Sequence, residues 1–289
     1  HGAPTMLYEV LVVDNNSTDA TAGDVEQIMA RHANVRYVRE ERQGLSHARN
    51  RGLKENVSPW VAYVDDDGEV YDDFIEQVMD TIESGRFDAF GGVFLPKYSP
   101  GRPRWYRDAF ASNADVSSET CAIPHGPFWF CGGICAFRRS ALESVGGFPV
   151  NLGMTGQKLA YGEETLVQVR LHRAGYKLGF VPSIRMDHWV LPEKYRLWSF
   201  AKRAFGEGRD SWLSHDLAPS WRPLLRVYAS AAKRCLVAVS RLVVSWIPGT
   251  TWRAGACVAE ILMAIGNAAG STKGFSAGRR KSNRSRCIG

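Results

Sequence analysis

The stretch Trp60-Val61-Ala62-Tyr63-Val64-Asp65-Asp66-Asp67 places an uninterrupted apolar run directly before three aspartates. Such a run is typical of a strand that is buried on both faces. Adjacent carboxylates repel one another, and a divalent cation such as Mg²⁺ or Mn²⁺, which prefers oxygen ligands, relieves that repulsion. On a turn, Asp65 and Asp67 can point the same way. The stretch therefore predicts a metal site where a buried strand ends; the alternative is an acidic loop in water.

On both sides of this stretch, strand patterns alternate with helix patterns. The predicted strands are residues 8–13, 35–38, 60–64, 88–95, 128–137 and 178–181, and the predicted helices are residues 19–32, 46–56, 72–83 and 163–174. This alternation predicts an α/β fold with an open, mostly parallel, twisted sheet and helices on both faces. Ligands of such sheets bind beyond the carboxyl ends of the strands, where the polar clusters of this sequence lie.

Two of these clusters lie near the first strands. Asp14 ends the predicted strand 8–13, where a carboxylate can accept a hydrogen bond from a nucleotide base and the following helix N-terminus favours anions. The alternative is an Asx turn with a helix cap. Arg49 lies early in the predicted helix 46–56 and can pair with phosphate or a base carbonyl, although a surface arginine would look the same.

Three clusters lie further along the chain. Gly132 and Gly133 interrupt the predicted strand 128–137 and permit close backbone approach to a ligand, or form a bulge. Glu163 and Glu164 open a helix, where acids suit the helix dipole and where one of them can act as a general base. His188 follows the last predicted strand and is either a metal or phosphate ligand or a structural histidine.

In their order and spacing, these clusters resemble glycosyltransferase family 2. The matching stretches are residues 12–21, 44–50, 64–67, 131–137 with 146–148, 162–165 and 187–188, so the resemblance covers roughly residues 7–190. The family has the GT-A fold, takes nucleotide sugars that are commonly UDP-linked, uses Mg²⁺ or Mn²⁺, and inverts the anomeric centre by one in-line displacement. The resemblance thus implies a metal-dependent, inverting glycosyltransferase.

The resemblance also implies a role for each donor-side residue. Asp14 resembles the acid that reads the uracil, and Arg49 resembles the arginine on the nucleotide side. Asp65 and Asp67 resemble the D-x-D pair, with Asp67 as the metal ligand and Asp65 closer to the ribose. His188 completes the implied metal-ligand set.

On the acceptor side, Glu164 occupies the place of the catalytic base, where many relatives carry the shorter Asp. Glu163 is the neighbouring acid of that motif, and Gly132 and Gly133 resemble the acceptor-side turn. The implied partners are a nucleotide-sugar donor and a glycan or lipid-linked acceptor. By family analogy, the setting is the synthesis of cell-surface polysaccharide or glycolipid.

One departure from the family concerns the start of the sequence. Family members open with a further strand that lies in the middle of the sheet, whereas this sequence opens at His1, just before the predicted strand 8–13. We therefore expect the first strand and helix, about 30–40 residues, to be missing, which would leave strand 8–13 with an unpaired edge.

Two other functions are compatible with the pattern to different degrees. An inactive relic that binds a nucleotide sugar or a glycan would carry the same clusters. A sugar-phosphate nucleotidyltransferase shares the fold, but it would need a glycine-rich loop with Arg and Lys near the first strand, and the sequence shows none.

Charge divides the chain unevenly. Residues 217–289 hold 12 of the 36 Lys and Arg and one of the 30 acids, Glu260, which leaves 24 cations and 29 acids in residues 1–216. A basic end of this kind meets phosphate, either in nucleic acid or on a membrane. Nucleic acid is disfavoured because Phe275 is the only aromatic residue among the cations of residues 273–286.

We expect three parts: a GT-A domain in residues 1–215, a basic amphipathic helical region in residues 216–270, and a basic disordered tail in residues 271–289. Residues 222–247 predict a helix that either lies in a membrane interface or packs on the body with its cations in water. That segment and residues 273–286 are the predicted contacts with an anionic membrane surface. No stretch of about 20 uninterrupted apolar residues predicts a spanning helix here.

The six cysteines match no zinc-binding pattern, and a chain of 289 residues needs no disulfides to fold. This predicts reduced thiols and a cytoplasmic protein. Together with the basic C-terminal segments, it predicts a peripheral location at the inner face of the plasma membrane.

Overall fold

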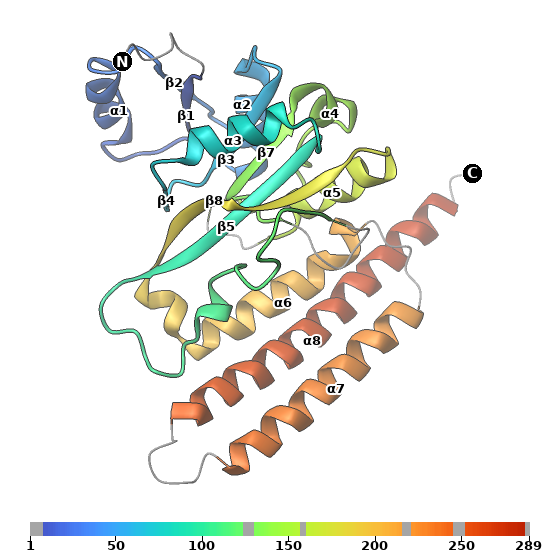
Figure 1. Cartoon of the computed structure of the whole chain (residues 1–289). Coiled ribbons are helices and arrows are strands. Elements are labelled where there is room, and N and C mark those ends of the chain that lie inside the picture. Colours follow the sequence, from blue (N-terminus) through green and yellow to red (C-terminus); the bar gives the residue numbers. More distant parts are fainter. Residues whose placement is uncertain (1–7, 124–129, 157–159, 216–220, 245–251, 287–289) are drawn as a thin grey trace.

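A computed structural model describes residues 8–123, 130–156, 160–215, 221–244 and 252–286 (Figure 1). The strands are β1 (Val10–Asp14), β2 (Val35–Arg39), β3 (Trp60–Val64), β4 (Gly68–Val70), β5 (Ala89–Tyr98), β6 (Cys121–Ala122), β7 (Ile134–Arg138) and β8 (Leu178–Val190). The α-helices are α1 (Thr21–Met29), α2 (Leu45–Glu55), α3 (Phe74–Glu83), α4 (Arg139–Ser144), α5 (Glu163–Arg173), α6 (Leu197–Ser214), α7 (Trp221–Val244) and α8 (Trp252–Arg286). Short 3₁₀ helices cover Asp108–Phe110 and Pro192–Tyr195.

The central sheet has the strand order β3-β7-β5-β8-β4, β6 pairs with β8, and β1 and β2 form a separate parallel pair. The predicted α/β class with a central sheet is confirmed. The prediction of a mostly parallel sheet is wrong, because β7 runs antiparallel to β3 and β5, and β4 and β6 run antiparallel to β8. A strand that is buried on both faces has the same apolar sequence in either direction, so its direction depends on the connections and not on the local pattern.

Helix α2 bridges the two sheets. In the described part of the chain, β1 pairs only with β2, and β3 pairs only with β7. A Cβ added at Gly52 of α2 would lie 3.7 Å from both Val13 of β1 and Tyr63 of β3. This packing holds β1 and β3 beside α2, and so fixes the place of the polar residues at the ends of these strands.

Helices cover both faces of the central sheet, as predicted, and β7 shows how the core is divided. Cys135 and Phe137 belong to a cluster that includes residues of α4 and α5, whereas Ile134 and Ala136 belong to a cluster that includes residues of α3. Because side chains alternate along a strand, a fully apolar strand supplies both layers of the core.

The last three helices form a layer in which α8 lies between α6 and α7 (Figure 1). Glycines on one side of α8 allow this close packing. A Cβ at Gly266, Gly270 or Gly274 would lie within 2.7 Å of a main-chain oxygen of α6. Aromatic residues before and within α6 join the layer to the rest of the protein, since Tyr106, Phe110 and Phe200 share a buried cluster with Ala259 of α8.

The predicted disordered tail is wrong for residues 271–286, because α8 continues to Arg286. Phe275 is buried and packs against Trp212 of α6 and Trp221 of α7, with tilted rings whose centroids are 5.5 and 4.7 Å apart. The basic composition of the segment gives no sign of this aromatic contact. The remaining residues of the predicted tail, 287–289, lie outside the described residues.

Among the described residues, Ala254–Ser276 of α8 is long and apolar enough to cross a membrane, judged by length and composition alone. Core helices of soluble proteins have the same length and composition, and 44% of the apolar 18-residue window in this segment is buried. The glycine contacts show that one side of α8 is packed on α6.

Replacing Gly270 by Ala is expected to lower the free energy of unfolding by about 1–3 kcal/mol, because the added Cβ would lie 2.0 Å from the Phe205 carbonyl oxygen and force α6 and α8 apart. Urea denaturation measures this. Gly23→Ala in α1 is the matched control: nothing lies within 4 Å of its Cβ, so the change should be neutral or stabilising by up to about 1 kcal/mol. Equal effects of the two substitutions would contradict the close packing.

Candidate active site

A buried arginine joins the two predicted halves of the site. Arg49 of α2 donates from Nη2 to Asp65 Oδ1 at 3.1 Å and from Nη1 to Glu163 Oε1 at 2.9 Å. The side chains of Arg49 and Glu163 are each only 6% exposed, and the guanidinium lies over the Phe148 ring. Arg49 is therefore committed to two carboxylates that come from the end of β3 and the start of α5.

The two glycines lie beside this network. The structure corrects the prediction that they interrupt a strand: they form a turn directly before β7. A Cβ at Gly132 would lie 2.8 Å from Arg49 Nη1 and 3.1 Å from the Glu164 Cβ, and a Cβ at Gly133 would lie 2.6 Å from Asp65 Oδ2. Glycine is thus required where the backbone passes Arg49 and Asp65.

Glu164, the predicted base, stands next to Glu163 at the start of α5. Burial, and then the charge of Glu163, raise the pKa of Glu164 to about 8, and Arg49 opposes them only in part. A carboxyl group with a pKa near neutrality is suited to take a proton from a hydroxyl group. Because Glu163 holds Arg49, the two adjacent acids differ in their contacts.

The three aspartates form a tight turn between β3 and β4. The Gly68 N–H donates to the Asp65 carbonyl oxygen at 3.0 Å, and a Cβ at Gly68 would lie 2.7 Å from the Met186 sulfur. The Asp65 carboxylate faces Arg49, whereas the Asp67 carboxylate faces β8. The contacts of the two carboxylates with the protein therefore differ.

Asp67 meets His188 and one residue that the sequence did not single out. The His188 Nε2 atom lies 3.1 Å from Asp67 Oδ2, and Lys194 Nζ lies 3.1 Å from His188 Nε2 and 3.6 Å from Asp67 Oδ2. The hydrogen bond with His188 is the main cause that lowers the pKa of Asp67. His188 lies within β8 rather than after it, since this strand is longer than predicted.

Asp67 and His188 fit a divalent cation. Two ligands of one octahedral ion with bonds of about 2.1 Å lie about 3.0 Å apart, close to the 3.1 Å between these atoms. Among the described residues, no three His, Cys, Asp or Glu side chains are placed so that they could together hold a metal ion, and Asp65 does not join the pair. A pair of protein ligands suits an ion that takes its other ligands from substrate phosphates and water.

Asp14 lies at the end of β1 with both carboxylate oxygens in use. Oδ1 accepts from the Ser17 N–H at 2.8 Å, and Oδ2 accepts from the Tyr37 hydroxyl at 2.6 Å. Burial raises the pKa of Asp14, but these hydrogen bonds outweigh it and the net pKa is lowered. Asp14 is thus a fixed anion. The Asx turn and helix cap named as its alternative are not formed, because the Ser17 N–H lies three rather than two positions after Asp14, and α1 begins without a side-chain cap.

Asn15 connects Asp14 with the rest of the site. Its Oδ1 atom accepts from the Gly44 N–H at 2.6 Å, just before α2, and Ser46 of α2 donates to the Leu152 carbonyl oxygen at 3.0 Å.

The sequence did not predict the contacts of Lys194 and Tyr37 with the site. Neither belongs to a recognisable motif, so the local sequence carries no signal for them.

The family match covers only part of this site, since it includes Asp14, Arg49, Asp65 and Asp67 but ends before Glu163, Glu164 and His188. Residues 3–146 match the family model described as "Glycosyl transferase family 2". The chain belongs to glycosyltransferase family 2. Its relatives include the glucosyl-dolichyl phosphate glucuronosyltransferase of Haloferax volcanii, 24% identical over 70% of this chain, and the succinoglycan biosynthesis protein ExoM of Rhizobium meliloti, 26% identical over 80%. The chain spans 65% of the first relative, which is less than two thirds, and 76% of the second.

Among solved structures, the fold is similar to that of the mannosyltransferase PcManGT from Pyrobaculum calidifontis, which was solved in complex with GDP-Man and Mn²⁺. The TM-score is 0.54 at 20% sequence identity, and the alignment covers 90% of this chain and 77% of the other. At this identity the likeness shows the fold alone.

Proposed function

We propose that this protein transfers a sugar from a UDP-linked donor to an acceptor hydroxyl group with inversion of the anomeric centre. One observation carries the proposal: buried Arg49 joins Asp65, on the donor side, to Glu163, next to the predicted base Glu164. Family membership and the raised pKa of Glu164 support it.

In the proposed reaction, Glu164 takes the proton of the acceptor hydroxyl. The acceptor oxygen forms a bond to the anomeric carbon while the bond from that carbon to the diphosphate oxygen breaks, and the diphosphate leaves with the electron pair. Arg49 holds Asp65 and Glu163 in place, and the Asp14 carboxylate accepts a hydrogen bond from the base of the nucleotide. Gly132 and Gly133 leave room on the acceptor side.

We propose Asp67 and His188 as the residues that hold Mg²⁺ or Mn²⁺. When bound, the ion would neutralise the negative charge that develops on the leaving diphosphate. Lys194, which lies beside both ligands, adds a fixed positive charge at the same place. The Mn²⁺ in the PcManGT complex supports a divalent ion in this fold.

The acceptor is proposed to be a glycan or a lipid-linked saccharide in polysaccharide or glycolipid synthesis, with the protein at the cytoplasmic face of a membrane. The support is the naming of a dolichyl phosphate glucuronosyltransferase and of a succinoglycan biosynthesis protein among the relatives. The basic C-terminal helices agree with this location.

Thermal unfolding with UDP and Mn²⁺ tests the donor site. A nucleotide at about 100 times its Kd should raise the melting temperature by about 5–10 °C, because it binds only the folded chain. GDP with Mn²⁺ and UDP with EDTA are the comparison conditions, and only UDP with the metal should give the full rise. Asp67→Asn should remove the metal-dependent part, whereas Asp24→Asn, in α1, should not. A cooperative transition that no nucleotide shifts would contradict the proposal.

A further inference from the structure

Helix α7 carries two stripes of mainly apolar residues, one packed against its neighbours and one exposed. Its packed residues recur at helical spacing: Leu224, Val227, Ala231, Cys235 and Ala238. Shifted by one position, the residues Leu225, Tyr228, Ala232, Leu236 and Val239 follow the same spacing and face outward. We call this second set the apolar stripe.

The apolar stripe is strongly exposed to solvent. Leu225 is 63% exposed, Leu236 is 72% exposed and Val239 is 49% exposed. Isolated exposed apolar residues are common on proteins, but a continuous stripe along several helical turns marks a contact surface.

Helix α8 continues this surface. The Tyr228 hydroxyl hydrogen-bonds with the Thr272 hydroxyl at 2.6 Å, so the apolar stripe faces the side of α8 on which Thr272 lies. Ile265 is seven residues before Thr272, which is two helical turns, and therefore lies on the same side; it is 55% exposed. The apolar stripe and Ile265 thus form one outer face of the α7–α8 pair.

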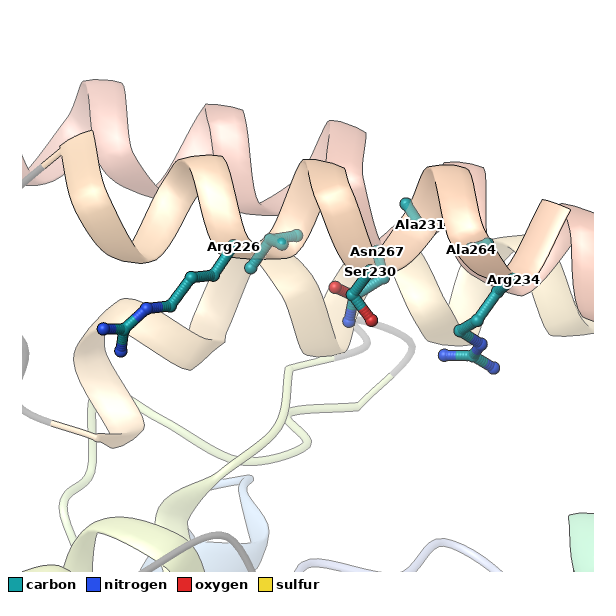
Figure 2. A pocket seen from close by; sticks show the side chains of 7 residues that line it. Arg226, Ser230, Ala231, Arg234, Ala264 and Asn267 are labelled. Carbon is teal, nitrogen blue, oxygen red and sulfur yellow. The ribbon is translucent and has the colours of Figure 1, made fainter. Parts of the chain in front are cut away.

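Cations lie beside the apolar stripe on α7. Arg222, Arg226 and Lys233 are exposed and follow it around the helix, opposite the packed stripe. Figure 2 shows Arg226 and Arg234 extending from one side of α7, along a groove of about 230 Å³ that also includes Ser230 and Asn267; by helical spacing, Arg234 and this groove lie on the side of α7 away from the apolar stripe. In the part of the chain that the structure describes, these four cations form no salt bridge, although Arg234 lies near Glu207.

Acidic charge is almost absent from this surface. Glu260 is the one acid of α7 and α8, and it is held by Arg107 and Arg241. A helix with an exposed apolar stripe, flanked by unneutralised cations, matches a bilayer surface in which acyl chains lie directly beneath anionic phosphates.

We propose that the outer face of α7 and α8 docks on an anionic lipid bilayer. The apolar stripe and Ile265 enter the interface, and Arg222, Arg226 and Lys233 contact lipid phosphates. The inference rests on the membrane location proposed above but not on the transferase chemistry. A spanning arrangement is disfavoured because α7 carries five cations and α8 packs on α6 through its glycines.

Flotation of the full chain with vesicles tests the proposal. We expect binding to phosphatidylcholine vesicles that contain phosphatidylglycerol, weaker binding to pure phosphatidylcholine, and weakening by salt. Leu225→Ser with Leu236→Ser should reduce the partition coefficient at least about tenfold, since both side chains would leave the interface. Arg226→Gln with Lys233→Gln should reduce it only for the anionic vesicles.

Val57→Ser is the matched control, because Val57 is 86% exposed on the loop after α2, far from α7 in sequence. All variants should keep their melting temperature and their response to nucleotide, so a failure of the membrane proposal is separate from a failure of the donor site. Equal flotation of all variants would overturn the proposal. Light scattering tests whether the same face binds a second copy. If the wild type self-associates but does not bind vesicles, and the Leu225→Ser, Leu236→Ser variant does not self-associate, the proposal is overturned and the face is assigned to a second copy.

Discussion

Replacing Glu164 by Gln is expected to lower kcat by about 100- to 10,000-fold, because the amide cannot take the proton of the acceptor hydroxyl group. The measurement is the steady-state rate of sugar transfer from a UDP-linked donor at saturating concentration. Donor binding should persist, since Glu163 and not Glu164 holds Arg49. Glu164→Asp should keep part of the activity, because many family members are expected to use the shorter acid here.

The pH dependence gives a second readout of the same group. Below its pKa of about 8, Glu164 is mostly protonated and cannot act as a base. Thus kcat/KM should rise about tenfold per pH unit up to that value and then level off. Because folding raises the pKa of Glu164, the folded state favours the neutral acid. The free energy of unfolding of the wild type should therefore fall as the pH rises from about 4.5 to 8. For Glu164→Gln it should fall less.

Glu207 supplies the matched control for this prediction. Burial raises the pKa of Glu207 too, but it lies on α6, outside the predicted site. Glu207→Gln should therefore retain kcat and the ascending pH profile. If Glu164→Gln were as active as Glu207→Gln, Glu164 would not be the base.

Replacing Arg49 by Met is expected to cost about 3–5 kcal/mol of folding stability, because Glu163 would remain as a buried, uncompensated carboxylate. Urea denaturation measures the loss. The double variant Arg49→Met, Glu163→Leu should recover a large part of it, since no unpaired charge is then buried. Turnover should fall in both variants, because Asp65 and the start of α5 lose their common anchor.

Arg36→Met is the control for the Arg49 prediction. Arg36 also binds two carboxylates, those of Glu9 and Glu55, but at the surface, where ion pairs contribute little. A far smaller loss of stability is expected. An Arg49→Met variant as stable as Arg36→Met would show that the buried network does not hold the site together.

Much of the site could be predicted from local sequence. The apolar run of β3 followed by three aspartates marks a strand end with clustered carboxylates, whatever the rest of the fold is. Asp14 after β1 and the acids at the start of α5 are marked in the same way. These signals are local, since they depend on residue type and on the spacing within one strand or helix.

Other features depended on which distant segments meet. The sequence predicted Arg49 on the nucleotide side, yet its contacts are with Asp65 and with Glu163, which is 114 positions away. Lys194 beside Asp67 carries no motif. The direction of β7 and the anchoring of Phe275 were likewise beyond local patterns.

The sequence by itself thus determined where strands end, which carboxylates follow them, and which family the chain resembles. The tertiary structure decided which of those carboxylates pair with Arg49 and which one contacts His188. The physical reason is that periodicity and charge are properties of one segment, whereas a buried ion pair exists only when packing excludes water from two segments at once.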